Sequence, residues 1–100
     1  MTEADEPDAS DKRWGLEVRG RAQRQLARLP EKVATAAAEF ITGPLLDNPL
    51  RVGHPLRDEY DGQYSARRGR DWRVRYRLDH HARIVIILDV SHRSDTYGTR

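Results

Sequence analysis

The stretch Trp72-Arg73-Val74-Arg75-Tyr76-Arg77-Leu78 decides the fold. Apolar residues and arginines alternate in it without exception, so the apolar side chains share one face of a strand and the arginines share the other. The stretch therefore predicts a half-buried strand whose outer face is basic.

Two further strands are predicted beside it. Residues 83–90 are apolar at nearly every position and rich in isoleucine and valine, which is typical of a central strand with both faces covered. Asp79-His80-His81 is short and polar enough for the intervening turn, and Gly69-Arg70-Asp71 plays the same part after a strand at 64–68. The order predicts a three-stranded antiparallel meander.

The N-terminal half supplies a strand and two helices. Apolar residues alternate over 14–18, and they recur at helical spacing over 21–29 and again from Pro30 to residue 42, where Gly43-Pro44 gives a stop signal. Residues 44–62 are rich in proline and glycine without either period, so we expect a loop that four leucines pin to the core: Leu45, Leu46, Leu50 and Leu56. The predicted fold is a small α+β domain of order β-α-α-β-β-β, ending in a short C-terminal helical turn at residues 96–97.

The charge of the chain is unevenly distributed. Residues 1–12 are acidic and contain little to bury, so they are expected to form a disordered tail before a single domain at 13–100. Residues 12–100 hold 18 basic and 11 acidic side chains, a formal charge of +7, and 16 of those 18 are arginine. Such a surface favours a polyanionic partner, either a nucleic acid or an acidic protein segment.

The composition also excludes several kinds of protein. The chain has no cysteine, which excludes disulfides, thiolate metal sites and thiol nucleophiles. No apolar run approaches the roughly 18 residues that a membrane helix needs. We therefore expect a soluble, cytoplasmic protein without a membrane partner.

Several segments, in order, resemble the RelE/ParE toxins of bacterial toxin–antitoxin pairs, and most closely the actinobacterial RelE branch. These segments are Gly43-Pro44-Leu45-Leu46-Asp47-Asn48-Pro49, His54-Pro55-Leu56, Gly62-Gln63-Tyr64-Ser65-Ala66-Arg67-Arg68-Gly69, Trp72-Arg73-Val74-Arg75-Tyr76 and His92-Arg93-Ser94-Asp95-Thr96-Tyr97. The resemblance implies a ribosome-dependent endoribonuclease that cleaves mRNA in the A site and is neutralised by a RelB-like antitoxin. It also implies that operator DNA is bound only through the antitoxin complex.

The resemblance also implies a set of site residues. Arg67 or Arg68 matches a basic position on the second strand of the fold, and Arg73 matches the arginine on its third strand. The catalytic set implied is Arg67, Arg73, His92, Arg93 and Tyr97, with His54, Arg68, Arg70 and Arg75 in RNA binding. Family members often carry lysine where this chain has His54 and Arg67, which leaves the general base open.

The chemistry needs a base for the 2′-hydroxyl, a cation for the phosphate and an acid for the leaving 5′-oxygen. Arginine suits the second task but gives up its proton too reluctantly for the first. His92 is the candidate acid or base and His54 is a weaker candidate, and each has a structural role as its alternative. No cluster of residues has metal-ligand spacing, so no metal or other cofactor is expected.

Two other functions fit the same pattern. A ParE-like inhibitor of DNA gyrase would share the fold and act by binding. A non-catalytic RNA-binding module would need only the basic face of the strand. Loss of toxicity on replacing Arg73 or His92 would distinguish the nuclease from these alternatives.

Overall fold

The structure, a computed structural model, describes residues 13–92. The predicted acidic tail and the predicted C-terminal helical turn lie outside the described residues. The elements in chain order are β2 (Gly15–Val18), α2 (Gly20–Arg28), α3 (Glu31–Thr42), α4 (Pro44–Asp47), α5 (Pro49–Val52), β3 (His54–Pro55), the 3₁₀ turn η1 (Asp58–Tyr60), β4 (Gln63–Arg68), β5 (Trp72–Asp79) and β6 (Ile84–His92). None of the described helices is long and apolar enough to cross a membrane.

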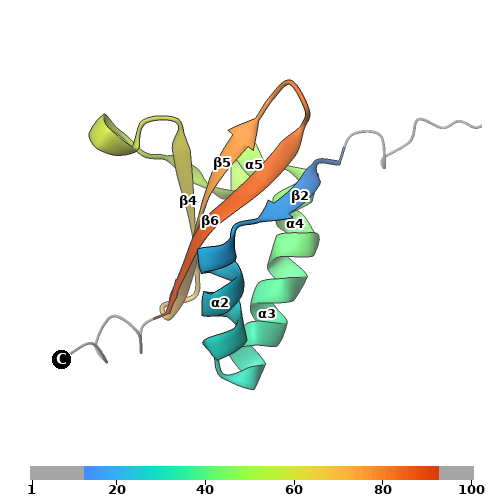
Figure 1. Cartoon of the computed structure of the whole chain (residues 1–100), viewed down its shortest axis with the longest axis vertical. Helices are drawn as coiled ribbons and strands as arrows, with labels where there is room; N and C mark the ends of the chain where they lie inside the picture. Colours follow the sequence, from blue (N-terminus) through green and yellow to red (C-terminus); the bar gives the residue numbers. More distant parts are fainter. Residues whose placement is uncertain (1–12, 93–100) are drawn as a thin grey trace, which may run out of the picture.

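The strands form one five-stranded sheet in the order β2-β6-β5-β4-β3. The predicted antiparallel meander is confirmed, because β4 pairs with β5 and β5 pairs with β6 in antiparallel fashion. The N-terminal strand joins the far side of this meander by pairing in parallel with β6. The chain reaches β6 from β2 only after passing through the helices and the rest of the sheet (Figure 1).

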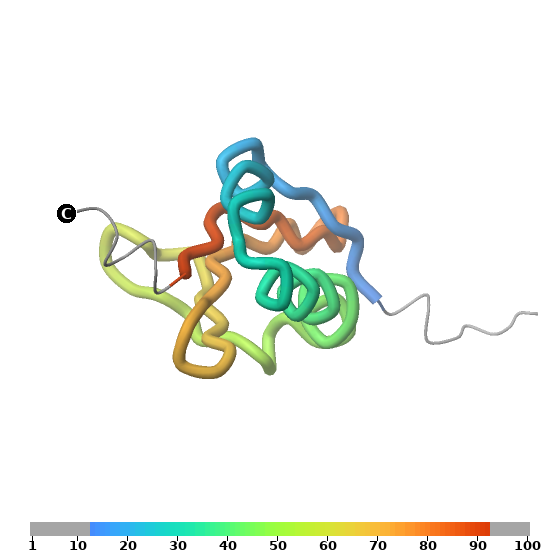
Figure 2. Tube along the Cα trace, turned by 90° about the horizontal axis from the view of Figure 1, so that it is seen from below, coloured from blue at the N-terminus to red at the C-terminus, as the bar shows by residue number. Residues whose placement is uncertain are grey.

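The core lies between one face of the sheet and the helices. Val74, Tyr76 and Leu78 are buried on β5, as their alternation predicts, and they pack in one cluster with Ala37 and Phe40 of α3. Figure 2 shows α2 and α3 on one side of the strands, whereas the segment around η1 projects on the other side. We call the sheet surface that faces away from the helices the open face.

The prediction of a loop over residues 44–62 is wrong in part. The segment contains α4, α5, β3 and η1, and the two short helices each begin at a proline. Proline suits the first helical position because its fixed φ is helical and its missing N–H would have no partner there. Of the four leucines expected to anchor this segment, Leu45 and Leu46 are buried, but Leu56 is half-buried and Leu50 is 51% exposed.

Tyr76 fixes this segment to the sheet. The buried Tyr76 hydroxyl donates a hydrogen bond of 2.6 Å to the carbonyl of Pro49. Burial, with the nearby Tyr64, raises the pKa of Tyr76 above its ordinary value, so the hydroxyl stays protonated and can donate. Gly53 is needed here because a Cβ at this position would overlap the Tyr76 hydroxyl.

The central strand β6 differs from the prediction in its burial and also contains an irregularity for which no prediction was made. Only one of its faces is fully buried, at Val85, Ile87 and Val90, whereas the residues between them are half-buried. A β-bulge shifts the register, since Arg75 pairs with Asp89 but the next residue of β5 pairs with Ile87.

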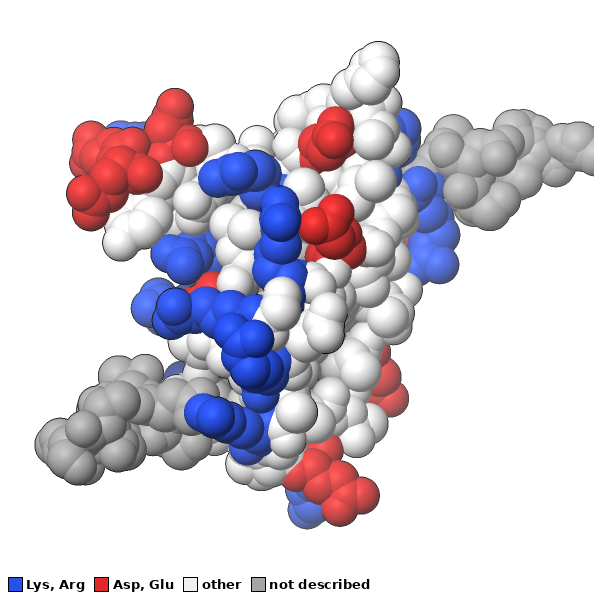
Figure 3. Space-filling model, in the orientation of Figure 1, with Lys and Arg blue, Asp and Glu red and all other residues white. Residues whose placement is uncertain are grey.

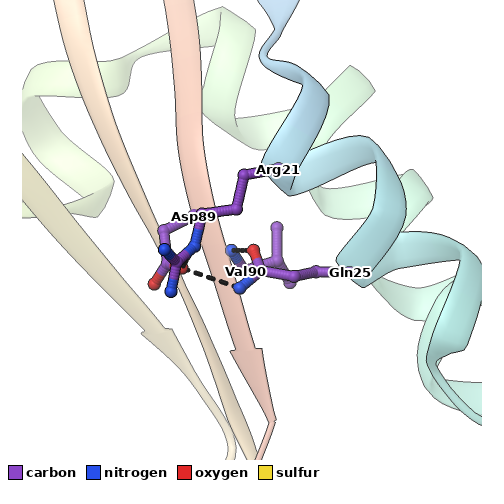
Figure 4. Close-up of polar contacts among 4 residues, drawn as sticks. All are labelled: Arg21, Gln25, Asp89 and Val90. Carbon is purple, nitrogen blue, oxygen red and sulfur yellow. Dashed lines mark hydrogen bonds and ion pairs between the residues drawn. The ribbon is translucent and has the colours of Figure 1, made fainter.

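Helix α2 completes the edge of β6 where β2 ends. The partners of β2 on β6 run only from Ile84 to Ile87. Beyond them, the Val90 N–H donates to Gln25 Oε1 at 2.6 Å, and Gln25 Nε2 donates to Asp89 Oδ1 at 2.8 Å. Arg21 Nε reaches the same carboxylate oxygen at 3.1 Å (Figure 4). A glutamine side chain thus takes the place of a further strand along this edge.

Candidate nucleic-acid interface

The arginines of β4 and β5 meet on the open face. Arg67 lies directly opposite Arg73, and Arg73 lies opposite Ser91 of β6. Residues that pair across antiparallel strands project from the same face of a sheet, with Cβ atoms about 5 Å apart. Because Val74, the neighbour of Arg73, points into the core, Arg67 and Arg73 project from the open face, where both are exposed.

A second row of residues crosses the same face. His54 of β3 pairs with Ser65, Ser65 pairs with Arg75, and Arg75 pairs with Asp89. The two rows are two residues apart along each strand, which is about 7 Å. The structure therefore brings four of the predicted site residues to one surface: His54, Arg67, Arg73 and Arg75.

No acidic side chain of the described chain neutralises these arginines. Arg67, Arg73 and Arg75 make no ion pair with any residue in the range 13–92. Asp89 stands opposite Arg75, but its carboxylate oxygen is held by Arg21 and Gln25 of α2. Figure 3 shows a column of basic atoms over the side of the molecule where Figure 1 draws the sheet.

Arg75 has an aromatic neighbour instead. Its Cζ lies 5.4 Å from the centre of the Tyr60 ring, a cation–π contact made by a residue of η1. The Arg75 Nε is buried and has no hydrogen-bond partner among the described residues. Tyr60 itself is 42% exposed.

Arg68 and His92 lie on the other face. Arg68 and His92 both pair with Trp72, next to the pair formed by Arg67 and Arg73. The Arg68 Cζ lies 4.4 Å from the centre of the Phe40 ring of α3, and Phe40 meets Trp72 edge to face. The register thus separates Arg68 and His92 from Arg73 by the thickness of the sheet.

The remaining predicted residues lie either in a turn or outside the described residues. Arg70 is exposed in the turn that joins β4 to β5. Arg93 and Tyr97 lie outside the described residues. Within 13–92, His, Asp and Glu residues form no group of three that could hold a metal ion.

Tyr60 is a residue of this surface that could not be recognised from the sequence alone. It lies in the segment that lacks either period, and its contact with Arg75 depends on how the chain between β3 and β4 folds back. The one hint in the sequence is that Tyr60 stands among the acidic residues Asp58, Glu59 and Asp61. Because these neighbours offer no apolar surface to cover the ring, an exposed aromatic residue is expected there.

Comparison with known proteins agrees with this architecture. Residues 16–97 match the protein family described as the ParE toxin of the type II toxin–antitoxin system parDE. The chain belongs to the ParE toxin family of type II toxin–antitoxin systems. It is 45% identical to toxin RelE of Mycobacterium tuberculosis over 89% of this chain and 91% of that protein. It is 49% identical to toxin RelG of the same organism over 76% of this chain and 86% of that protein.

Solved structures of RelE/ParE toxins share the fold. The toxin–antitoxin complex RelBE2 of M. tuberculosis contains a chain that superposes with a TM-score of 0.78 at 43% identity, covering 81% of this chain and 99% of that chain. The isolated E. coli RelE toxin superposes with a TM-score of 0.68 at 19% identity, covering 85% of this chain and 92% of that one. The predicted membership of the RelE/ParE superfamily is confirmed, and with it the assignment of the chain as a type II toxin.

Proposed function

We propose that this toxin is an endoribonuclease that cleaves mRNA on the ribosome, with the open face of the sheet as its active surface. The observation that carries the proposal is the pair Arg67 and Arg73, two exposed guanidinium groups directly opposite each other with no acidic partner in the described chain. Like charges opposite each other on neighbouring strands destabilise a sheet. A phosphate bound between them would accept charge-assisted hydrogen bonds from both guanidinium groups and so offset their repulsion.

The proposed reaction is a transesterification that needs no metal. The 2′-oxygen of the ribose attacks the adjacent phosphorus and loses its proton to a base, the bond from phosphorus to the 5′-oxygen breaks, and that oxygen takes a proton from an acid. The products are a 2′,3′-cyclic phosphate and a 5′-hydroxyl. Arg67 and Arg73 would hold the phosphate oxygens and stabilise the additional charge of the transition state.

His54 is the proposed proton-transfer residue of the described surface. It is exposed and lies in the row of Ser65 and Arg75, on the same face as Arg73. Histidine is the side chain best suited to exchange protons near neutral pH. His92 is assigned a lesser part because its register position is on the helix-covered face. Arg93 and Tyr97 remain proposed members of the site from the sequence resemblance alone.

The partners proposed follow from the charge and from the relatives. A RelB-like antitoxin would cover the basic column, in keeping with the toxin–antitoxin complexes among the similar structures. Operator DNA would be bound only through that complex. Because the substrate is mRNA during translation, we place the toxin in the cytoplasm.

The test is a cell-free translation reaction containing the purified toxin and an end-labelled mRNA. The proposal predicts cleavage within the reading frame only when the message is translated, with 5′-hydroxyl and cyclic-phosphate ends. Ends carrying a 5′-phosphate would contradict the metal-independent mechanism. Intact mRNA together with inhibition of DNA gyrase would instead support the alternative function, a ParE-like inhibitor of gyrase.

A further inference from the structure

The loop between β3 and β4 presents an aromatic ring beside the proposed phosphate site. A backbone hydrogen bond of 2.8 Å from Leu56 N–H to the Gln63 carbonyl closes the base of this loop. Within it, Asp58 and Gly62 have φ values of 60° and 89°, and the Tyr60 N–H donates to the Arg57 carbonyl at 3.1 Å. The loop is therefore a defined turn, and Tyr60 stands at its exposed end.

The guanidinium of Arg75 holds the Tyr60 ring in place. Arg75 is half-buried on β5, and its Cζ lies 5.4 Å from the ring centre. Its buried Nε has no hydrogen-bond partner in the described part of the chain, so the aromatic contact is the interaction available to this cation. A ring fixed before the ligand arrives loses less conformational entropy on binding than a free one.

The position of Tyr60 relates it to Arg73. Arg75 and Arg73 are two residues apart on β5 and share the open face, so the ring neighbours the proposed phosphate site. Arg73 and Arg75 lie about 7 Å apart along the strand, and the Tyr60 ring lies beside the guanidinium of Arg75. Exposed aromatic rings beside a basic groove bind single-stranded nucleic acid by stacking on its bases.

The charges around the ring limit which part of a ligand can reach it. Asp58, Glu59 and Asp61 are all exposed beside Tyr60 and appear as the acidic cluster at the η1 end of the molecule in Figure 3. They repel a phosphate backbone, but a nucleobase carries no charge. A strand with its phosphate on Arg67 and Arg73 could therefore extend a base to Tyr60 while its backbone turns away from the loop.

We propose that Tyr60, held by Arg75, is a stacking platform for one unpaired base of the RNA strand whose phosphate lies on Arg67 and Arg73. This inference rests on the proposed function only in taking single-stranded RNA as the ligand, and it does not require that the RNA be cleaved. Tyr60 would position the strand and contribute to the choice of the nucleotide at the neighbouring site.

The test measures the binding of a short, fluorescently labelled, fully 2′-O-methylated single-stranded RNA, which lacks the attacking hydroxyl. Tyr60→Leu should weaken binding by about tenfold, while Tyr60→Phe, which keeps the ring, should bind almost as the wild type does. An RNA with one abasic nucleotide should bind the wild type more weakly by a similar factor. Tyr60→Leu should bind that abasic RNA almost as well as it binds the intact RNA. The abasic measurement uses the unaltered protein, so it is independent of any effect of the substitution on folding.

The salt dependence separates stacking from charge. Tyr60→Leu should leave the slope of log Kd against log salt concentration unchanged. Arg73→Ala should reduce that slope by the amount expected for the loss of about one phosphate contact. Leu50→Ala, which removes another exposed apolar side chain, should have no effect on either quantity.

Equal affinity of the wild type and Tyr60→Leu for the RNA would overturn the inference. So would a Tyr60→Leu variant that binds an acidic peptide more weakly than the wild type does but binds the RNA equally well. The absence of RNA binding by the wild type at low salt would overturn it as well. RNA that is bound in a Tyr60-dependent manner but never cleaved during translation would leave the inference standing and would contradict the proposed function.

Discussion

Arg67 of β4 lies directly opposite Arg73 of β5, and neither guanidinium has an acidic partner within the described chain. Such a pair is unfavourable in an isolated sheet because both charges project from the same face about 5 Å apart at Cβ. Asp89, the acid nearest in register to this surface, is engaged by Arg21 and Gln25. The arrangement favours a bound polyanion over an empty face.

Replacing either arginine of this pair should separate activity from stability. Arg73→Ala should lower the cleavage rate about 100-fold or more, because a cation that stabilises the transition state is lost. The same change should leave the free energy of unfolding unaltered or raise it by about 0.5 kcal/mol, since the like-charge pair is relieved. Cleavage assays and urea unfolding of the same preparation test both parts.

Arg28→Ala is the matched control, since Arg28 is exposed at the end of α2 and not on the open face. It should alter neither the cleavage rate nor the stability appreciably. A loss of stability in Arg73→Ala as large as its loss of activity would show that Arg73 serves the fold.

The two histidine candidates should behave differently. His54→Ala should lower the single-turnover cleavage rate about 100-fold or more, because a proton-transfer group on the open face is removed. His54→Gln should be equally slow, because glutamine keeps hydrogen bonding but transfers no proton. His92→Ala should cost much less. The reverse order of effects would place the acid or base on His92, in spite of its register position opposite Trp72.

Gly53→Ala should destabilise the fold strongly. The added methyl group would overlap the Tyr76 hydroxyl, which is buried and donates to the Pro49 carbonyl. Relieving the overlap would break that hydrogen bond and leave buried polar groups unpaired, at a cost of about 1–3 kcal/mol. Thermal or urea unfolding measures the loss. Gly69→Ala has no side-chain neighbour to meet and should lose only the cost of its positive φ, so it is the comparison variant.

Gln25→Ala should open the edge of β6. The variant loses the acceptor of the Val90 N–H and a donor to Asp89, which should lower the free energy of unfolding by about 1–3 kcal/mol. Gln23→Ala removes a glutamine that is exposed and bonds the Val18 carbonyl at 2.8 Å, so it should cost less. Hydrogen exchange at Val90 should rise in Gln25→Ala alone, and unchanged protection there would contradict this account of the edge.

Alternation and helical spacing were enough to predict most of the fold. The buried face of β5, the two long helices and the antiparallel meander all follow from periods that the residues themselves display. The parallel pairing of β2 with β6 could not be predicted in this way, since it joins segments about 70 residues apart through the packing of the whole domain. The short helices after Gly43 were missed because four residues are too few to display a period.

The site was less predictable because it depends on strand register. The sequence placed Arg67 and Arg68 together as candidates, but neighbouring residues of a strand project from opposite faces, and only the pairing with β5 decides which one joins Arg73. His92 was separated from Arg73 by the same rule. The contact of Tyr60 with Arg75 required the path of an irregular segment, for which the sequence carries no periodic signal.

The measurement that tests the central claim most directly is primer extension on mRNA from cells expressing wild-type toxin, Arg73→Ala or Arg28→Ala. The account predicts cuts within translated reading frames for the wild type and for Arg28→Ala, and their loss in Arg73→Ala at an equal level of folded protein. Cuts that persist in Arg73→Ala, or intact mRNA in arrested wild-type cells, would contradict it.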